Sequence, residues 1–353
     1  MSPFLPRFAV TVAPVRVRFG ESALDVIAEE VVRLGCRRAL ILTTPAQASM
    51  AEAFARALGP VAAGVFTGAR MHTPTDVTDA ALSHVRSTSA DCLVAVGGGS
   101  TTGLGKALAL RTDLPQIVVP TTYAGSEATA ILGQTEAGRK TTITDARVQP
   151  EVIIYDPVLV ATLPVGMTVA SGLNAMAHAV EALYARDRNP LSSALAVQGL
   201  QAMIAGLPLV VADPSDLTAR SQTLYGAWLC GTVLGQVGMA LHHKLAHVLG
   251  GSFDLPHAET HAILLPHTIG FNAQADGLAP LTEMLGAAAG PGLHAFARGL
   301  GAPLALRELG MTAADLDRAA EMAVQNPYWN PRPITRDGIR ALLHAAWLGD
   351  APL

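Results

Sequence analysis

Short apolar runs alternate with helical patterns along the first 155 residues, and this alternation constrains the fold more than any other feature of the chain. The apolar runs occupy residues 15–19, 39–42, 61–66, 92–96, 117–119 and 152–155. Helical periodicity fills intervals between them, at residues 23–34, 51–58, 77–87 and 104–109. Strands that are joined through helices run parallel and bury both faces of their sheet. We therefore expect a parallel α/β sheet in which residues 15–19 form an edge strand.

The pattern changes at about Leu163-Pro164, where strand signals stop and long segments rich in alanine and leucine begin. A chain of 353 residues is long enough for two domains with separate cores. We expect an α/β domain over residues 1–162 and an all-α domain over residues 163–353, with a functional site in the crevice between them. A last helix is predicted at residues 336–348, after a stiff aromatic loop at residues 326–333.

The composition excludes some function classes. A net charge of −4, with 15% charged residues and no basic run, gives no electrostatic case for binding nucleic acid. Pro3 and Pro6 interrupt the N-terminus before a signal-type apolar core can form, and we expect no membrane-spanning run. Three separated cysteines in apolar sequence indicate free thiols and a cytoplasmic location: Cys36, Cys92 and Cys230.

A glycine-rich turn, GGGSTTG at residues 97–103, follows the predicted strand at residues 92–96. Backbone N–H groups at such a strand end, together with the positive end of the next helix, can face a pyrophosphate. Glycine also permits tight strand-to-helix packing without a ligand, so the turn alone leaves both interpretations open. The hydroxyl-rich segment at residues 120–126 follows the next strand, and it could bond nucleotide oxygens or merely line a turn.

Histidines gather in one stretch of the second domain. Six of the eleven lie there: His242, His243, His247, His257, His261 and His267. A helix is predicted at residues 239–249, with Gly250-Gly251 as its stop, so His243 and His247 share a face. Pro256 can fix a turn that brings His257 toward that face. A single histidine here could be a hydrogen-bonded helix residue, as we expect for His242, but the group indicates a chemical site.

Another helix carries Asn174 and His178, four residues apart and on one face. Together with His243 and His257 they could present one amide and three imidazoles to a single centre. Three imidazoles suit zinc or ferrous iron, although such enzyme sites usually add a negatively charged ligand. Here the fourth candidate ligand is neutral.

The motifs GGGSTTGLGKA, PTTYAGSEAT, SGLNAMAHAVEALYA and ALHHKLAHVLGGSFDLPHAETHAILLPH occur in this order. With them the chain resembles the iron-containing alcohol dehydrogenase superfamily over essentially its whole length, and the step from His243 to His257 is specific for that superfamily. PHAETH and NPYWNPRPI are similar to the maleylacetate reductase branch. The resemblance implies a dehydroquinate synthase-like architecture, with a Rossmann-like dinucleotide-binding domain before the all-α domain, and we expect a homodimer.

The resemblance also implies cofactor contacts. It assigns four residues to the pyrophosphate turn: Gly97, Gly98, Gly99 and Ser100. It assigns three more to the phosphates and the nicotinamide ribose: Thr121, Thr122 and Ser126. His247 matches a histidine close to the nicotinamide. Thr44 stands near the place where NAD-preferring relatives carry an aspartate, so nothing repels a 2′-phosphate, and we expect both NADH and NADPH to be accepted.

Asn174 stands where the metal-dependent relatives carry an aspartate ligand. Loss of that charge removes several kcal/mol of attraction for a divalent ion in a partly desolvated site. The expectation from the sequence is therefore that no metal is needed, with His178, His243 and His257 as residual ligands if a metal binds.

The activity that the resemblance implies is reduction of the conjugated carbon-carbon double bond of maleylacetate, giving 3-oxoadipate in the degradation of aromatic compounds. His243 and His247 are the leading candidates for proton transfer, and which of them donates stays open. Four residues are candidates for holding the dicarboxylate substrate: Tyr123, Lys140, Lys244 and Arg332. The alternatives are a metal-dependent alcohol or aldehyde dehydrogenase, a lyase that resembles the dehydroquinate synthases, and a non-catalytic nucleotide-binding protein.

Overall fold

The computed structural model describes residues 8–136 and 139–352, and contacts divide the chain into two compact units. The α/β unit is Ala13–Leu163, and the helical unit takes residues 164–352 together with residues 8–12. The sequence-based division places the boundary one residue earlier and starts the first domain at residue 1. Residues 8–12 differ from that expectation because they precede the first strand and take no part in the sheet.

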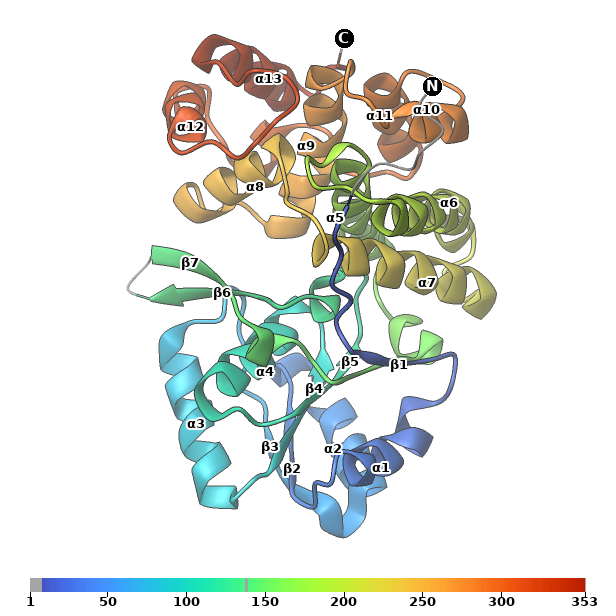
Figure 1. Cartoon of the computed structure of the whole chain (residues 1–353), viewed down its shortest axis with the longest axis vertical. Coiled ribbons are helices and arrows are strands. Elements are labelled where there is room, and N and C mark those ends of the chain that lie inside the picture. The colour runs from blue at the N-terminus through green and yellow to red at the C-terminus, as the bar shows by residue number, and fades with distance from the viewer. Residues whose placement is uncertain (1–7, 137–138, 353) are drawn as a thin grey trace. The chain divides into compact units, whose positions relative to one another are not determined.

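The α/β unit is built on a six-stranded parallel sheet with the order β1-β8-β5-β4-β2-β3 (Figure 1). Its strands are β1 (Arg16–Phe19), β2 (Ala39–Leu42), β3 (Ala62–Phe66), β4 (Cys92–Gly97), β5 (Gln116–Pro120) and β8 (Val152–Tyr155). The chain adds β3 on one side of β2 and then β4 on the other, so the strand order reverses between β2 and β4. Ligands of such sheets bind outside the carboxyl ends of the strands at this reversal.

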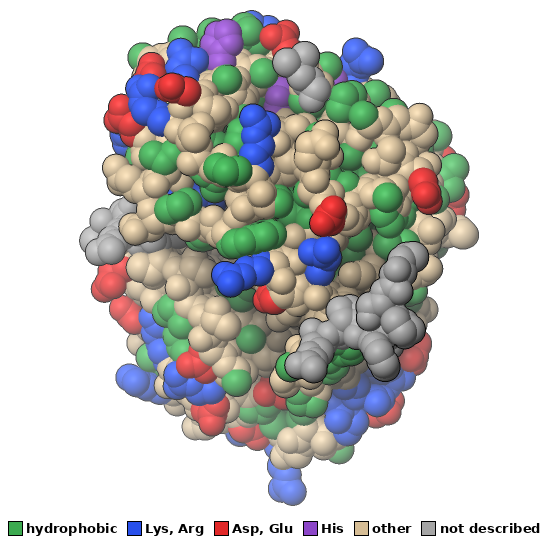
Figure 2. All heavy atoms as spheres, turned by 45° about the horizontal axis from the view of Figure 1, so that its top comes forward, with side chains coloured by type: hydrophobic (Ala, Val, Ile, Leu, Met, Phe, Trp, Pro, Cys, Tyr) green, Lys and Arg blue, Asp and Glu red, His purple; other side chains and the backbone are tan. Residues whose placement is uncertain are grey.

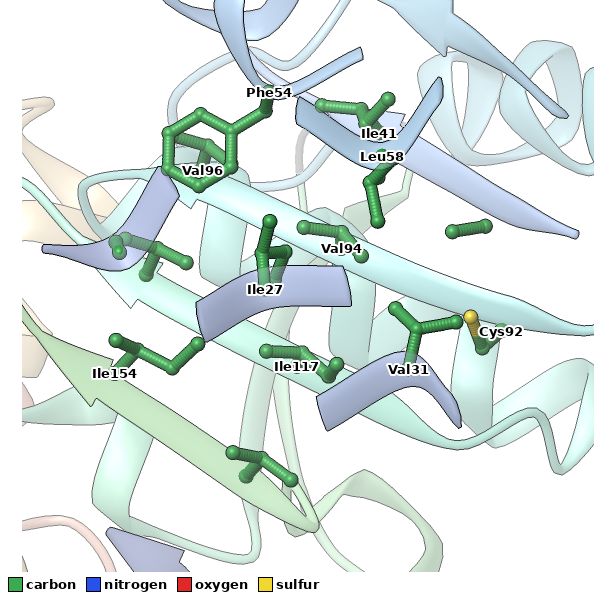
Figure 3. Close-up of a cluster of buried hydrophobic side chains, with 14 of the residues drawn as sticks. Ile27, Val31, Ile41, Phe54, Leu58, Cys92, Val94, Val96, Ile117 and Ile154 are labelled. Carbon is green, nitrogen blue, oxygen red and sulfur yellow. The ribbon is translucent and has the colours of Figure 1, made fainter. Parts of the chain in front are cut away.

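Two layers of helices cover the sheet. They are α1 (Ala23–Arg33), α2 (Ala48–Leu58), α3 (Thr75–Thr88) and α4 (Gly99–Thr112). Successive strand residues point to opposite faces, so Ile41 packs with Ile27 of α1 and Phe54 of α2 (Figure 3), whereas Leu40 and Leu42 pack with the cores of α3 and α4. Burial on both faces explains why the strands read as unbroken apolar runs. The expected α/β fold class is confirmed.

An antiparallel hairpin of β6 (Ile131–Glu136) and β7 (Arg139–Thr144) was not expected from the sequence. Its strands are polar, with threonine, glutamine and basic residues, and so lack the apolar run by which the other strands are recognised. The described residues also form six short 3₁₀ turns: η1 (Pro45–Gln47), η2 (Gly59–Val61), η3 (Ser126–Ala128), η4 (Ala146–Val148), η5 (Pro157–Val160) and η6 (Leu306–Leu309).

The helical unit contains α5 (Val165–Tyr184), α6 (Pro190–Ala212), α7 (Leu217–Leu234), α8 (Leu241–Ser252), α9 (His257–Phe271), α10 (Ala279–Leu285), α11 (Ala289–Gly299), α12 (Asp315–Val324) and α13 (Arg336–Leu348). Several helix boundaries differ from the expected ones, and the start of α4 and the end of α8 are instructive. α4 begins at Gly99, so residues 99–103 are its first turns rather than a loop. α8 continues through Gly250 and Gly251 to Ser252, because packing outweighs the cost of about 1 kcal/mol that glycine carries inside a helix.

α6 has 23 residues and a mean hydropathy of 1.8, so by length and composition alone it could span a membrane. A core helix of a large helical domain passes the same test. Here α6 packs against α7 so closely that a Cβ on Gly199 would lie 2.9 Å from Cys230 Sγ.

Acidic, basic and apolar side chains are interspersed on the face shown in Figure 2.

Candidate functional site

One face of α5 carries three buried polar side chains, Asn174, His178 and Glu181, at intervals of four and three residues. These intervals place side chains above one another along a helix. Asn174 and His178 are among the site residues predicted from the sequence, and Glu181 is not. The signal for Glu181 was present, because it lies three residues after His178 within the same apolar helix.

The imidazole of His178 meets that of His243 from α8. His178 Nδ1 and His243 Nε2 are 2.8 Å apart, and His243 Nδ1 lies 2.7 Å from Glu181 Oε2. Because the carboxylate can only accept, His243 Nδ1 carries a proton and donates it to Glu181. In neutral His243 the lone pair is then on Nε2 and faces His178, whose Nδ1–H donates to it. His243 Nε2 can therefore take a proton or bind a cation.

Glu181 also fixes the start of α8. Its carboxylate is fully buried and accepts from the backbone N–H groups of Ala240 and His242, at 2.9 and 2.7 Å. A negative charge at a helix N-terminus satisfies donors that have no partner within the helix. The same side chain thus positions α8 and orients one of its histidines.

A second imidazole pair lies beside the first. His242 Nε2 is 2.8 Å from His261 Nδ1, and His242 Nδ1 is 3.1 Å from Thr268 Oγ1. Burial, together with the neighbouring imidazoles, lowers the pKa of both His242 and His261 well below the usual value. These two rings are therefore neutral and packed. The ring centroid of His257 lies 4.5 Å from that of His261. The ring centroid of His261 lies 5.2 Å from that of His243.

His247 lies on the same face of α8 as His243, with ring centroids 6.2 Å apart. Its Nδ1 is 3.1 Å from the phenol oxygen of Tyr328, which belongs to the aromatic loop at residues 326–333. Burial and the charge of Glu181 raise the pKa of Tyr328, so the phenol keeps its proton at neutral pH. The sequence analysis noted this loop but did not select Tyr328.

The donors on α5 and α8 fit a divalent metal ion. Asn174 Oδ1 is buried and has no hydrogen-bond partner among the described residues, although a buried amide oxygen is normally satisfied. It shares its helix face with His178, whose ring adjoins His243 Nε2. One amide oxygen and two imidazoles are ligands that zinc and ferrous iron accept. A carboxylate behind a ligating histidine, as Glu181 stands behind His243, is the usual arrangement around such ions.

In the α/β unit, the predicted cofactor residues follow the carboxyl ends of β2, β4 and β5. The backbone N–H of Thr121 donates to Gly97 O at 3.1 Å. Gln47 links the segment after β2 to the segment after β5. Its amide nitrogen lies 2.9 Å from Thr121 Oγ1, and its amide oxygen lies 3.4 Å from Thr44 Oγ1. The structure thus brings Thr44, the glycine turn and the segment after β5 to one edge of the sheet.

Glycine is required at the turn itself. Gly97 has a φ of +156°, and a Cβ there would collide with Thr101. A Cβ on Gly98 would lie 2.8 Å from Thr122 Cγ2. At Gly99, the first residue of α4, a Cβ would meet no described atom within 4 Å. The helix N-terminus is therefore open at Gly99 and next to Ser100, where an anion can approach the backbone.

A buried lysine that the sequence analysis missed holds the segment after β5. Lys106 Nζ donates to the carbonyls of Ser126 and Thr129, each at 2.6 Å, and to that of Ile131 at 3.0 Å. Burial lowers the pKa of Lys106 to about 7. Since Ser126 is one of the predicted cofactor residues, Lys106 fixes the backbone on which that hydroxyl stands.

The predicted substrate residues have different environments. Lys244 donates to Gln325 O at 2.9 Å and lies 5.9 Å from the Tyr328 ring centroid, next to the histidine cluster. Arg332 donates to Phe271 O at 3.0 Å and stacks on that ring, which indicates a structural contact. Tyr123 is fully buried. Lys140 lies in β7, and its side chain is outside the described part of the structure.

Comparison with known proteins gives consistent matches along the chain. Residues 14–157 match the family model for iron-containing alcohol dehydrogenase, and residues 168–347 match the C-terminal model of the Fe-containing alcohol dehydrogenase family. A maleylacetate reductase from Rhizobium sp. (strain MTP-10005) is 60% identical over 347 residues, which cover 98% of this chain and 99% of the relative.

Two solved structures extend the comparison. The crystal structure of maleylacetate reductase from Agrobacterium tumefaciens is 58% identical with a TM-score of 0.96, covering 99% of this chain and 100% of the other. An iron-containing alcohol dehydrogenase from Corynebacterium glutamicum is 38% identical with a TM-score of 0.93, covering 98% of each chain.

These matches correct the expectation that no metal is involved. Both halves of the chain match models of an iron-containing family, which indicates iron as a cofactor. The expectation was wrong because it treated the neutral Asn174 as evidence of a lost site. An asparagine still offers an oxygen ligand, and Asn174 Oδ1 is one of several buried polar atoms without a hydrogen-bond partner among the described residues.

Proposed function

Because this chain belongs to the iron-containing alcohol dehydrogenase family and, within it, to the maleylacetate reductases, we propose that it reduces maleylacetate to 3-oxoadipate with NADH or NADPH. The full-length identity to a relative with that name carries the proposal. The buried array of His178, His243 and Glu181, with His247 beside it, offers groups for the proton transfer that such a reduction needs.

The proposed reaction is a conjugate reduction. Hydride moves from the nicotinamide to the alkene carbon beside one carboxylate, and the electron pair of the double bond moves onto the ketone as an enolate. A proton then adds to the neighbouring carbon. One maleylacetate, one NAD(P)H and one proton give one 3-oxoadipate and one NAD(P)⁺. The protein must orient the substrate, stabilise the enolate oxygen and supply the proton.

We propose that the cofactor binds at the carboxyl edge of β2, β4 and β5. The open backbone at Gly99 and Ser100 would accept the pyrophosphate, and Thr121, Thr122 and Ser126 would bond phosphate and ribose oxygens. Thr44 places a neutral hydroxyl rather than a carboxylate at the end of β2, so a 2′-phosphate meets no repulsion there. We therefore expect the protein to accept both NADH and NADPH.

His247 is the proposed group for proton transfer, and His243 is the alternative only while its Nε2 is not bound to the ion. The Glu181 carboxylate accepts from His243 Nδ1 and so fixes the orientation of that ring. His247 is held by Tyr328, whose protonated phenol fixes the orientation of the ring. An imidazole held in a fixed orientation can act as a general acid.

Asn174, His178 and His243, with His257 as a further candidate, would hold the iron ion. When bound, a ferrous ion supplies positive charge for the oxygen anion that develops on the substrate. Lys244 is the proposed partner for one substrate carboxylate, because Gln325 O anchors it beside the aromatic loop while its ammonium can make further contacts. Homodimer formation and a cytoplasmic location stay predictions.

The direct test is to add maleylacetate to the purified protein and follow the loss of NADH or NADPH absorbance, with 3-oxoadipate identified by mass spectrometry. Nicotinamide deuterated at the transferred position should place deuterium on the carbon beside the carboxylate. Oxidation of simple alcohols without reduction of maleylacetate would instead support an alcohol dehydrogenase. That outcome would reject the proposed substrate.

The roles of the two histidines have their own test. Replacing His243 or His247 by alanine should lower kcat by about a hundredfold or more, because general acid catalysis contributes on that order. His344→Ala is the matched control, since this imidazole is exposed on α13 outside the cluster. Circular dichroism checks the fold, and near-normal turnover in both variants would defeat the assignment.

A further inference from the structure

Two thiols and a carboxylate converge at the amino edge of the parallel sheet. Cys36 follows α1, whereas Asp91 and Cys92 stand at the start of β4. One ligand atom from each of the three residues lies within 4.8 Å of the others. β4 is six residues long, so this edge is on the order of 17 Å from the carboxyl edge proposed for the cofactor.

Hydrogen bonds fix this arrangement. The carboxylate oxygens of Asp91 accept from the backbone N–H groups of Arg37 and Arg38, at 2.9 and 2.8 Å. The thiol of Cys36 lies 3.5 Å from Asp91 O. These bonds hold residues 36–38 next to Asp91. The three side chains are therefore already close together before a ligand binds. Each Asp91 oxygen keeps a lone pair for one further contact.

We propose that Cys36, Cys92 and Asp91 form a binding site for a soft divalent cation of the zinc class. Zinc binds thiolate sulfur at about 2.3 Å and carboxylate oxygen at about 2.0–2.2 Å, so its ligand atoms are separated by roughly 3.3–3.8 Å. Ligand atoms that lie up to 4.8 Å apart reach that spacing when they approach one another by roughly 1–1.5 Å. A water molecule can complete four ligands. This site is separate in composition from the imidazole cluster of the helical unit.

Binding exchanges protons for the ion. Burial raises the pKa of both thiols, so both carry protons at neutral pH. One divalent ion displaces two protons and forms two metal–sulfur bonds, and no electrons are transferred. Affinity should therefore fall as the pH is lowered. The access route is at Cys36 and Asp91, because Cys36 is 7% exposed and Asp91 half-buried, whereas Cys92 is fully enclosed.

Cadmium is the chosen probe, because cadmium–thiolate bonds give an ultraviolet charge-transfer absorption that imidazole ligands do not give. Titration of the full chain with Cd²⁺ should produce this band at one equivalent, and Zn²⁺ should compete it away. Cys36→Ser and Cys92→Ser should each lower the affinity at least about tenfold. Cys230→Ser is the matched control, because Cys230 is the third buried thiol and lies in α7 of the other unit.

The proposal is overturned if the wild-type chain gives no band at saturating Cd²⁺, or if the band survives in both variants. Loss of the band in Cys230→Ser would also overturn it. Should a serine variant unfold, the corresponding alanine variant and the thermal midpoint give a second measurement. Zn²⁺ should raise the midpoint of the wild type, because an ion that binds the folded state stabilises it, but not that of either alanine variant.

Discussion

Glu181 determines which nitrogen of His243 carries a proton, and it does so with a side chain that is fully buried. A buried carboxylate is costly unless each oxygen accepts hydrogen bonds, and here it accepts from His243 and from two backbone N–H groups of α8. The residue therefore has a structural and a chemical role at once. The two roles can be separated by a substitution that keeps the size and removes the charge.

Glu181→Gln should lower kcat by about tenfold to a hundredfold with a smaller change in KM, because loss of the carboxylate that holds a site histidine carries an effect of that size. An amide can donate as well as accept, so His243 loses the partner that fixes its tautomer. Nitrogen NMR of histidine-labelled protein measures this directly. Glu283→Gln, an exposed position on α10, is the control. An unchanged His243 tautomer in Glu181→Gln would reject the positioning role.

At the scale of elements, the sequence predicts most of the architecture. Residues 39–42 and 336–348 are predicted with the observed bounds of β2 and α13, because apolar periodicity and flanking breakers agree at both places. The hairpin β6–β7 is missed since a polar hairpin has no such signal. For the candidate site, Asn174, His178 and His243 can be selected from spacing. Glu181 lies at the same helical spacing and could be selected with them. Lys106 cannot, because a charged residue in a sequence gives no sign that it is buried.

The contact between α6 and α7 depends on glycine. A Cβ at Gly206 would lie 2.6 Å from Thr223 Oγ1 and 3.1 Å from Thr223 N. Gly206→Ala should therefore destabilise the protein by about 1–3 kcal/mol, since overpacking forces the helices apart. Gly166→Ala in α5 meets no described atom within 4 Å and should be neutral or stabilising by about 0.4–1 kcal/mol. Urea unfolding compares the two, and equal stabilities would show that the α6–α7 contact is not tight.

At the scale of the whole molecule, the two units should respond to acid in different pH ranges. In the α/β unit burial raises the pKa of Glu30, but hydrogen bonds from Arg33, Arg18 and Arg16 lower it further, to below the usual value. Stability from Glu30 is thus present above the pKa of a free glutamate and is lost as the pH falls through the lowered value. In the helical unit burial lowers the pKa values of His242, His261 and His267, so their contribution to stability is present above the pKa of a free imidazole and is lost as the pH falls below it. This loss begins at a higher pH than the loss from Glu30.

His267 tests this directly, because burial lowers its pKa to about 4 and its Nε2 has no hydrogen-bond partner among the described residues. A free imidazole titrates near pH 6.5. Between roughly pH 6.5 and 4, His267 is therefore protonated in the unfolded chain but neutral in the folded chain. Stability from His267 is therefore complete above that range and is lost as the pH falls through it, by about 2 kcal/mol at pH 5. His267→Gln should lose correspondingly less free energy of unfolding between pH 7 and pH 5 than the wild type, whereas the exposed His344→Gln should match the wild type. Equal losses in His267→Gln and the wild type would show that His267 accepts a proton in the folded state, and would move the acid sensitivity of this unit to the imidazole pair of His242 and His261.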